Sequence, residues 1–445
     1  MISGWDSRNT LQRPWRFVSI AAFLAAGILC MVPESGQAQS NPLKDLETKA
    51  QASPSSVDLQ MSLGLAYLDS GRIEEARACF QRIGKLDRND MRGSWGLALA
   101  LMAEDKYEDA KSTCRAMTPR NGKEAQTCLG YVFIRNGRGT LAEEAFNKAL
   151  ASSPGYAPAQ TGLGDTYLSQ TRVDDAMAAY QKALSLDPKF GLALLGQGQA
   201  HLRKGDLASA ALDLKQAVLA LPGWASPYLH LGRALGDKPG AVEAFRTAIL
   251  INPDFAEAFQ ALGQSLVQSG KSEEGIQALR KAVELEPKMG MAHFNLGLAL
   301  WNLKRPDEAD PELMKAVELI PNLPQAHETL GDIDKGRSRF EDAVVHYQEA
   351  LRQAPGENRL NLKLGESNMG LGKNTLAWSY LDKAANNDPK CSLAYSLMAR
   401  MACGRREFDR GQALIDKALA GDGKGVDSKQ LRDLKSSCVS TISTP

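Results

Sequence analysis

A nine-residue segment returns along this chain about every 34 residues, and this repetition constrains the fold more than any other feature. The segment reads KALSLDPKF at 182–190, TAILINPDF at 247–255, KAVELEPKM at 281–289 and KAVELIPNL at 315–323. An alanine stands five residues before each recurring proline, and the prolines lie at 154, 188, 222, 253, 287, 321, 355 and 389. A fixed period of this length indicates one structural repeat stacked many times.

The segment 256–289 shows what one repeat contains. It has two apolar stretches with helical spacing, separated by Ser269, Gly270 and Lys271. The proline near the end stops the second helix, because the residue before a proline is driven out of the α-helical region. Gly263 costs the first helix about 1 kcal/mol relative to alanine. This cost is tolerable if the glycine lets the second helix approach closely.

These positions resemble the tetratricopeptide repeat, a helix–turn–helix repeat of 34 residues. The repeat that matches best has Gly164, Tyr167, Ala176, Tyr180, Ala183 and Pro188, and the first repeat has Gly64, Tyr67, Ala76 and Phe80. The resemblance implies an all-α fold, a right-handed superhelical α-solenoid of about eleven repeats. We place them at 57–90, 91–122, 123–156, 157–190, 191–224, 225–255, 256–289, 290–323, 324–357, 358–391 and 392–425.

The ends of the array are predicted from the same phase. Residues 39–56 read as a linker followed by an N-terminal capping half-repeat helix, 426–438 as a C-terminal capping helix, and 439–445 as a tail. Each repeat buries its apolar face only against its neighbours, so an array needs such caps. The second and sixth repeats are shorter than the others, near 118–122 and 236–240.

Residues 1–38 have the pattern of a secretory signal peptide. Three arginines precede the uncharged apolar run 17–32, and small residues follow it, with Ala38 as the expected cleavage point. We therefore expect an exported, periplasmic protein. The alternative is an uncleaved inner-membrane anchor through residues 17–32 that faces the periplasm, although this run is short for a membrane span.

The sequence does not point to catalysis. It contains no HExxH, CxxC, GxSxG or P-loop motif, and the array leaves no segment for a separate catalytic domain. We expect no enzyme activity, no cofactor and no metal, because His293 and His327 occupy one packing slot in adjacent repeats without convergent ligands. Lys and Arg total 53 against 52 for Asp and Glu, so no charge excess indicates nucleic acid binding.

Six of the seven cysteines lie after residue 38, and an even number in an exported chain permits disulfides. Cys114 lies in the second helix of one repeat and Cys128 in the first helix of the next, so this pair is the predicted disulfide. The alternative is that both are small buried apolar residues. Cys403 and Cys438 form a second candidate pair.

The resemblance also implies which residues meet a ligand, because first helices of this family line the concave face. Two apolar groups fall at the implied positions. The N-terminal group comprises Met61, Leu65, Leu68, Trp95, Leu99, Met102 and Tyr131, and the second group comprises Met291, Phe294, Leu298 and Trp301. Further along or between them, the same positions hold Leu195, Leu202, Leu229, Arg233, Glu328, Asp332, Lys335, Arg359 and Glu366. Alternatively, superhelical twist or the capping half-repeat covers the apolar groups.

The combined prediction is a non-catalytic scaffold that binds peptides or amphipathic helices of other proteins on its concave face. The resemblance implies assembly of a cell-envelope complex, such as a pilus, secretion or polysaccharide export complex, and such a complex can be membrane-associated. The alternative is an accessory subunit that binds a glycan or another small ligand in the groove. Hydrogen-bonding side chains near Trp301 would favour the glycan, and a continuous apolar strip would favour a partner helix.

Overall fold

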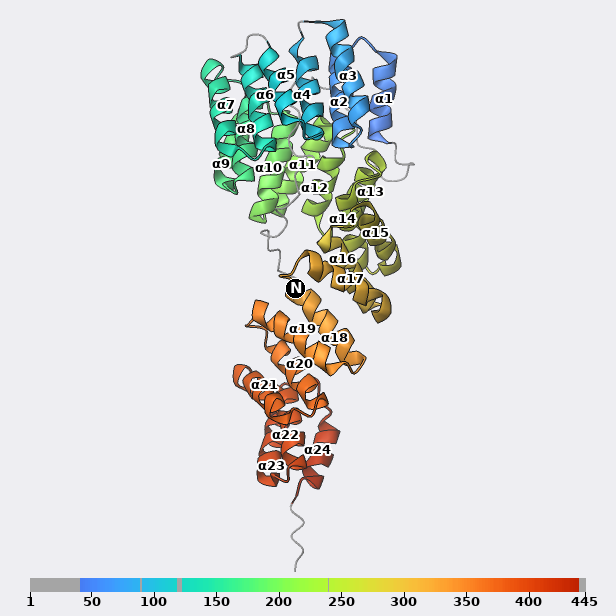
Figure 1. Cartoon of the computed structure of the whole chain (residues 1–445), viewed down its shortest axis with the longest axis vertical. Coiled ribbons are helices and arrows are strands. Elements are labelled where there is room, and N and C mark those ends of the chain that lie inside the picture. The colour runs from blue at the N-terminus through green and yellow to red at the C-terminus, as the bar shows by residue number, and fades with distance from the viewer. Residues whose placement is uncertain (1–40, 89, 118–121, 239, 440–445) are drawn as a thin grey trace, which may run out of the picture. The chain divides into compact units, whose positions relative to one another are not determined.

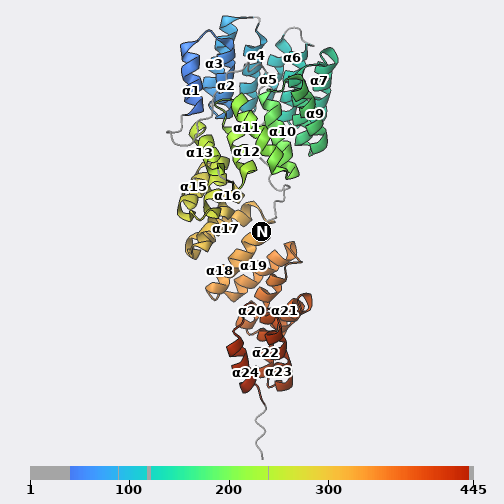
Figure 2. The same ribbon diagram turned by 180° about the vertical axis from the view of Figure 1, so that it is seen from behind.

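The structure is a computed structural model that describes residues 41–88, 90–117, 122–238 and 240–439. The expected signal peptide, the membrane-anchor alternative and most of the expected tail lie outside these residues. The described residues form 24 α-helices and contain no strand. The chain is therefore an all-α repeat solenoid, as predicted (Figures 1 and 2).

The chain divides after Leu285 into two compact parts, which we call the N-terminal body and the C-terminal body. The helices of the N-terminal body are α1 (Pro42–Ala52), α2 (Val57–Asp69), α3 (Ile73–Leu86), α4 (Met91–Ala103), α5 (Tyr107–Ala116), α6 (Lys123–Arg135), α7 (Gly139–Ser152), α8 (Ala157–Ser169), α9 (Val173–Leu186), α10 (Gly191–Lys204), α11 (Leu207–Ala220), α12 (Ala225–Leu235), α13 (Ala241–Ile251), α14 (Ala256–Gln268) and α15 (Ser272–Leu285).

The C-terminal body begins at Glu286. Its helices are α16 (Gly290–Asn302), α17 (Pro306–Leu319), α18 (Pro324–Gly336), α19 (Phe340–Gln353), α20 (Asn358–Gly370), α21 (Asn374–Asn387), α22 (Ser392–Gly404), α23 (Phe408–Ala420) and α24 (Ser428–Ser437). From α2 to α23, even-numbered helices are the first helices of the repeats and odd-numbered helices are the second helices, while α24 follows the last repeat.

In most repeats the two helices pack through a glycine. A Cβ atom on Gly64 would lie 2.5 Å from the ring of Phe80, and one on Gly164 would lie 2.5 Å from the ring of Tyr180. Real Cβ atoms do not tolerate such contacts, so only glycine admits these rings between the helices. The predicted role of the recurring glycine in close helix packing is confirmed.

The turn between the two helices has the same backbone conformation in nearly every repeat. One residue of this turn has a positive φ, and it is glycine at Gly71, Gly137, Gly205, Gly270 and Gly372. In five other repeats, a residue other than glycine has the positive φ. These residues are Asp105, Thr171, Lys304, Ser338 and Arg406. The left-handed region is strained for residues with a Cβ atom, so these five turns have a higher conformational energy than the glycine turns.

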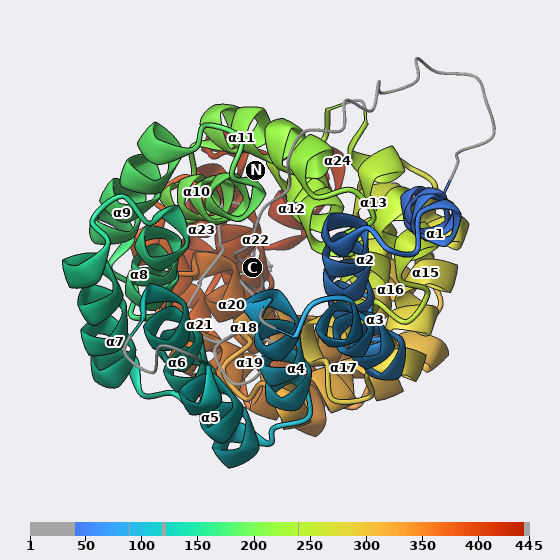
Figure 3. The same cartoon turned by 90° about the horizontal axis from the view of Figure 1, so that it is seen from above.

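In the N-terminal body the first helices lie on the inside and the second helices on the outside (Figure 3). First helices of neighbouring repeats contact each other directly, as α2 does with α4 and α6 with α8. In addition, α2 contacts α12, which follows it by more than 150 residues. The N-terminal body therefore closes on itself after one turn of helices.

Candidate partner-binding surfaces

The N-terminal apolar group does not form an open surface. All of its predicted members, Met61, Leu65, Leu68, Trp95, Leu99, Met102 and Tyr131, are buried in one hydrophobic cluster. Trp95 is 0% exposed, and its ring meets the edge of Tyr131 at a centroid distance of 6.0 Å, while Tyr131 meets Phe146 at 5.2 Å. This corrects the prediction of a groove there. Because successive first helices contact each other, their inner side chains pack together, and the alternative of a covered group holds.

A remote contact closes this body, and the sequence reading missed it. Asp69 at the end of α2 is 3% exposed and faces the start of α12. Its Oδ2 atom accepts hydrogen bonds from the backbone N–H groups of Ala225 and Ser226, the latter at 3.1 Å, and its Oδ1 atom accepts one from the Ser226 hydroxyl. Asp69 thus caps the N-terminus of a helix 156 residues away. No local feature of the sequence marks this contact, because its two sides lie 156 residues apart.

Two further contacts complete this closure, which we call the seam. The side-chain amide of Asn41 donates a hydrogen bond of 2.8 Å to the carbonyl of Leu250 in α13. Gly223 precedes α12, and a Cβ atom there would lie 3.3 Å from the Cα atom of Leu43 and 3.4 Å from the Cβ atom of Ala66. Its φ of +83° also favours glycine. The seam is therefore a specific fit, with few hydrogen bonds.

The predicted ligand-facing residues in the middle of the N-terminal body differ in how deeply they are buried. Leu195 and Leu229 are buried, whereas Leu202 and Arg233 are half-buried. Burial lowers the pKa of Arg233, and burial together with the charges of Arg233 and Arg203 lowers the pKa of His230 to about 3. His230 is therefore neutral at neutral pH.

The second apolar group, on α16 of the C-terminal body, is partly open. Met291, Leu298 and Trp301 are half-buried, and their spacing places them along one side of the helix. Phe294 is 9% exposed and belongs to the core, so its assignment to the open surface is corrected. Its spacing places it on the same side of the helix as Met291 and Leu298, but its side chain is packed more deeply. We call Met291, Asn295, Leu298 and Trp301 the α16 stripe.

The α16 stripe also contains a polar group. Asn295 lies one helical turn after Met291 and one before Leu298, and its Nδ2 atom is buried without a hydrogen-bond partner among the described residues. The ammonium group of Lys304 lies 5.7 Å from the centroid of the Trp301 ring. A buried amide donor without a partner costs about 1–3 kcal/mol.

The charged inner residues of α18 and α20 bind one another. Glu328 accepts hydrogen bonds from Arg359 at 2.9 Å and from Lys363 at 2.8 Å, and Lys363 also reaches Asp332 at 2.7 Å. Lys335 and Glu366 form a further pair at 2.6 Å. Burial raises the pKa of Glu328, but the two cationic partners outweigh burial and the pKa is lowered. These residues were predicted to meet ligand, and the structure instead joins α18 to α20 through them.

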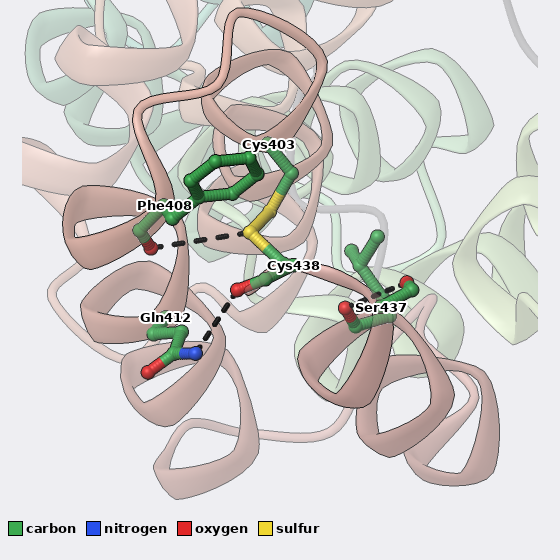
Figure 4. Close-up of a disulfide and its surroundings, with 6 residues drawn as sticks. Cys403, Phe408, Gln412, Ser437 and Cys438 are labelled. Carbon is green, nitrogen blue, oxygen red and sulfur yellow. Dashed lines mark hydrogen bonds between the residues drawn. A yellow bond between two sulfur atoms is a disulfide. The ribbon is translucent and has the colours of Figure 1, made fainter. Parts of the chain in front are cut away.

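Both candidate cysteine pairs are disulfide-bonded in the structure. Cys114 and Cys128 join α5 to α6 with a Cα–Cα distance of 5.6 Å, and Cys403 and Cys438 join α22 to the end of α24 with one of 5.4 Å. Figure 4 shows the second bridge, beside which Gln412 donates a hydrogen bond of 3.0 Å to the Cys438 carbonyl. A Cβ atom on Gly411 would lie 2.6 Å from the Cys403 sulfur, so glycine makes room for this bridge.

The histidines occupy packing positions. His293 uses both ring nitrogens, one 2.6 Å from a carboxylate oxygen of Glu312 and one 3.1 Å from the Pro287 carbonyl. In the next repeat, the Nδ1 atoms of His327 and His346 lie 3.4 Å apart. Among the described residues, no three histidines, cysteines or carboxylates are grouped so as to hold a metal ion.

These features define an all-α repeat protein whose first helices face inward in the N-terminal body. The tetratricopeptide repeat family matches residues 61–125, 96–157, 161–223, 260–325 and 329–390. The chain therefore belongs to the tetratricopeptide repeat family, whose members are generally non-catalytic scaffolds for protein interactions. No curated protein matches the chain. No helix in the described part of the chain has the length and hydropathy to span a bilayer.

Several solved structures are similar to this chain. They include the Cut9–Hcn1 hetero-tetramer of APC/C, at 14% identity over 89% of this chain and 92% of that chain with a TM-score of 0.42. Human IFIT1 bound to m7Gppp-AAAA matches at 15% identity over 79% and 95%, with a TM-score of 0.45. MamA matches at 29% identity over 37% and 91%, with a TM-score of 0.33. These TM-scores are below 0.5, so the family assignment depends on the repeats themselves.

Proposed function

We propose that this protein is a non-catalytic scaffold that captures a partner protein on the α16 stripe of its C-terminal body. The observation that supports this site is the contrast between two apolar groups predicted in the same way. Every residue of the N-terminal group is buried, whereas Met291, Leu298 and Trp301 keep part of their surface exposed. Exposed apolar side chains in a row, with an aromatic among them, are typical of interaction sites.

The form of the partner follows from the composition of the stripe. Met291, Leu298 and Trp301 offer apolar contacts, and Met and Trp are favoured at protein interfaces. Asn295 lies between them and is half-buried, with its Nδ2 atom enclosed, and a polar residue within the row suits the polar backbone of an extended peptide. The partner segment is therefore an extended, mostly apolar peptide.

A second function is favoured by the same asparagine. An aromatic ring beside a half-buried amide side chain is also an arrangement that binds sugars, through stacking on Trp301 and a polar contact with Asn295. The alternative proposal is an accessory subunit that holds a glycan on the α16 stripe. It differs from the first proposal in its ligand and not in its site.

The cellular context is part of the proposal. The pattern of residues 1–38 supports export to the periplasm, with cleavage or with retention of residues 17–32 as an anchor. The two disulfides of the structure suit an oxidising compartment. We therefore place the scaffold in a cell-envelope complex, such as one for pili, secretion or polysaccharide export.

The test compares three forms of the full chain in the cells that produce it. A chemical crosslinker is applied to wild type, to the Met291→Ala/Trp301→Ala double variant and to Met314→Ala. Met314 is an exposed apolar residue of the neighbouring helix α17, outside the stripe, and serves as the matched control. We expect one partner protein to be captured by wild type and by Met314→Ala, and at least tenfold less of it by the double variant.

Two outcomes would change the proposal. Equal capture by the double variant would contradict the α16 stripe as the site. No captured protein, together with binding to a glycan array that Trp301→Ala abolishes, would favour the glycan alternative.

A further inference from the structure

We propose that the seam between α2 and α12 is a latch that protonation of Asp69 tightens and ionisation of Asp69 loosens. The proposal concerns the N-terminal body alone and is independent of the α16 stripe. It depends on the position of the Asp69 carboxyl group in the contact between α2 of the first repeat and α12 of the sixth repeat.

The seam differs from every other helix contact of this body in how it is maintained. The other helix pairs reported for this body are adjacent in the chain or separated by one helix, so the connections between them keep them close. By contrast, α2 and α12 are separated by about 150 residues, and no short connection keeps them together. The seam is therefore where the body opens at the lowest cost in broken contacts.

The Asp69 carboxyl group is enclosed in this contact. It receives three hydrogen bonds from Ala225 and Ser226, and all of them cross the seam. Opening the seam would return the carboxyl group to water. Ionisation therefore has a different cost in the closed and open states, because burial disfavours the charged form.

Hydrogen bonds and burial act in opposite directions on Asp69. Burial raises the pKa, the hydrogen bonds from Ser226 and Ala225 lower it by less, and the pKa of Asp69 in the closed state is about 6. No charged side chain contributes to this shift. The protonated carboxyl group also fits the seam, since its hydroxyl can donate to the Ser226 oxygen while its carbonyl oxygen accepts the two N–H groups.

The charged groups on the helices around the seam have other partners. Glu47 of α1 pairs with Arg72 at 2.8 Å, and Arg92 of α4 pairs with Asp58 and Asp90. Arg233 of α12 is influenced by the charge of Glu257. Among the residues that the structure describes, no cation therefore compensates the charge of Asp69 in the closed state.

The direction of the effect follows from the raised pKa. The closed state binds the proton more tightly than the open state, where the pKa returns to about 3.8. The stabilisation of the closed seam is complete below about pH 3.8 and is lost as the pH rises through about 6. Acid therefore tightens the latch, and at neutral pH it is weakest. Opening would uncover Leu43 and Ala66, which Gly223 covers in the closed state.

The test uses hydrogen–deuterium exchange of the full chain at pH 4.5 and pH 6.5, after correction for intrinsic exchange rates. We expect exchange through opening in segments 57–69 and 225–235 to be roughly 20-fold faster at pH 6.5 than at pH 4.5 in wild type. Asp69→Asn imitates the protonated carboxyl group, so its seam should remain slow to exchange at both pH values. Asp58→Asn, an exposed change on the same helix, should behave as wild type.

Three results would overturn the proposal. The first is unchanged exchange at the seam of wild type between the two pH values. The second is faster exchange in Asp69→Asn than in wild type at pH 6.5, which would mean that the ionised carboxylate stabilises the seam. The third is an equal pH effect in segment 123–135, which is distant from the seam in sequence. Ser226→Ala, which removes one hydrogen bond, provides a second variant if Asp69→Asn does not fold; it should speed exchange at both pH values.

Discussion

The N-terminal and C-terminal bodies use the same repeat and treat its inner face differently. In the N-terminal body, apolar inner residues such as Trp95 and Tyr131 pack against each other and are buried. In the C-terminal body, the inner residues of α18 and α20 are charged and paired, and those of α16 stay partly exposed. A repeat position therefore determines the direction of a side chain but not its exposure, which depends on how closely neighbouring first helices approach.

The largest expected difference in stability between the two bodies comes from replacing one tryptophan in each of them by alanine. Trp95→Ala should destabilise the N-terminal body by about 3–5 kcal/mol, because it leaves a cavity where a fully buried ring was. Trp301→Ala should cost no more than about 1 kcal/mol, since Trp301 is half-buried. Denaturant unfolding of both variants gives the comparison. Similar losses for the two would show that Trp301 is a core residue.

The disulfide in the N-terminal body closes a shorter loop of the chain than the disulfide in the C-terminal body. Cys114 and Cys128 are 14 residues apart, and Cys403 and Cys438 are 35 apart. The chain-entropy model gives losses of about 3 and about 4 kcal/mol for replacing each pair by serine. Thermal unfolding of the two double variants measures these losses. Mapping of the untreated chain by mass spectrometry should find both bridges, and free thiols at Cys114 and Cys128 would contradict the first.

Acid should affect the two bodies in opposite directions. The lowered pKa of Glu328 means that its contribution is present above the ordinary glutamate pKa of about 4.5 and is lost as the pH falls below it. Glu328→Gln should therefore loosen α18 and α20 by about 1 kcal/mol at pH 7, a modest value because Arg359 is half-exposed. Hydrogen exchange of these helices should rise on acidification in wild type but change less in Glu328→Gln. An equal rise in both would exclude Glu328 as the cause.

The smallest expected effect concerns the turns between helices, which are alike in both bodies. Thr171 and Lys304 have φ near +61°, where a β-branched residue such as threonine is especially strained. Thr171→Gly should stabilise the N-terminal body by about 0.5–1 kcal/mol, and Lys304→Gly should stabilise the C-terminal body by somewhat less. Thermal unfolding measures both, with Gly71→Ala, the reverse change, as a destabilising control. A loss of stability in Thr171→Gly would show that the turn does not strain Thr171.

The sequence predicted the fold well because the repeat is local. The glycine and the aromatic residue that it admits, such as Gly64 and Phe80, lie within one repeat, so their pairing is visible in the spacing. The exposure of inner residues was predicted less well. It depends on contacts between repeats, and the contact of Asp69 with Ser226 spans 157 residues without any local signal. Phe294 was assigned to the surface for the same reason, since a position in a repeat does not reveal how deeply its side chain packs.

The most direct test of the proposed scaffold is site-specific photo-crosslinking from the α16 stripe. A photoreactive phenylalanine derivative is placed at position 291 in the full chain, and in a second protein at position 314 on α17. We predict that position 291 crosslinks to one partner protein, through an extended segment that mass spectrometry can locate, and that position 314 does not. Crosslinking of the same partner from position 314 but not from 291 would contradict the central claim that the α16 stripe is the binding surface.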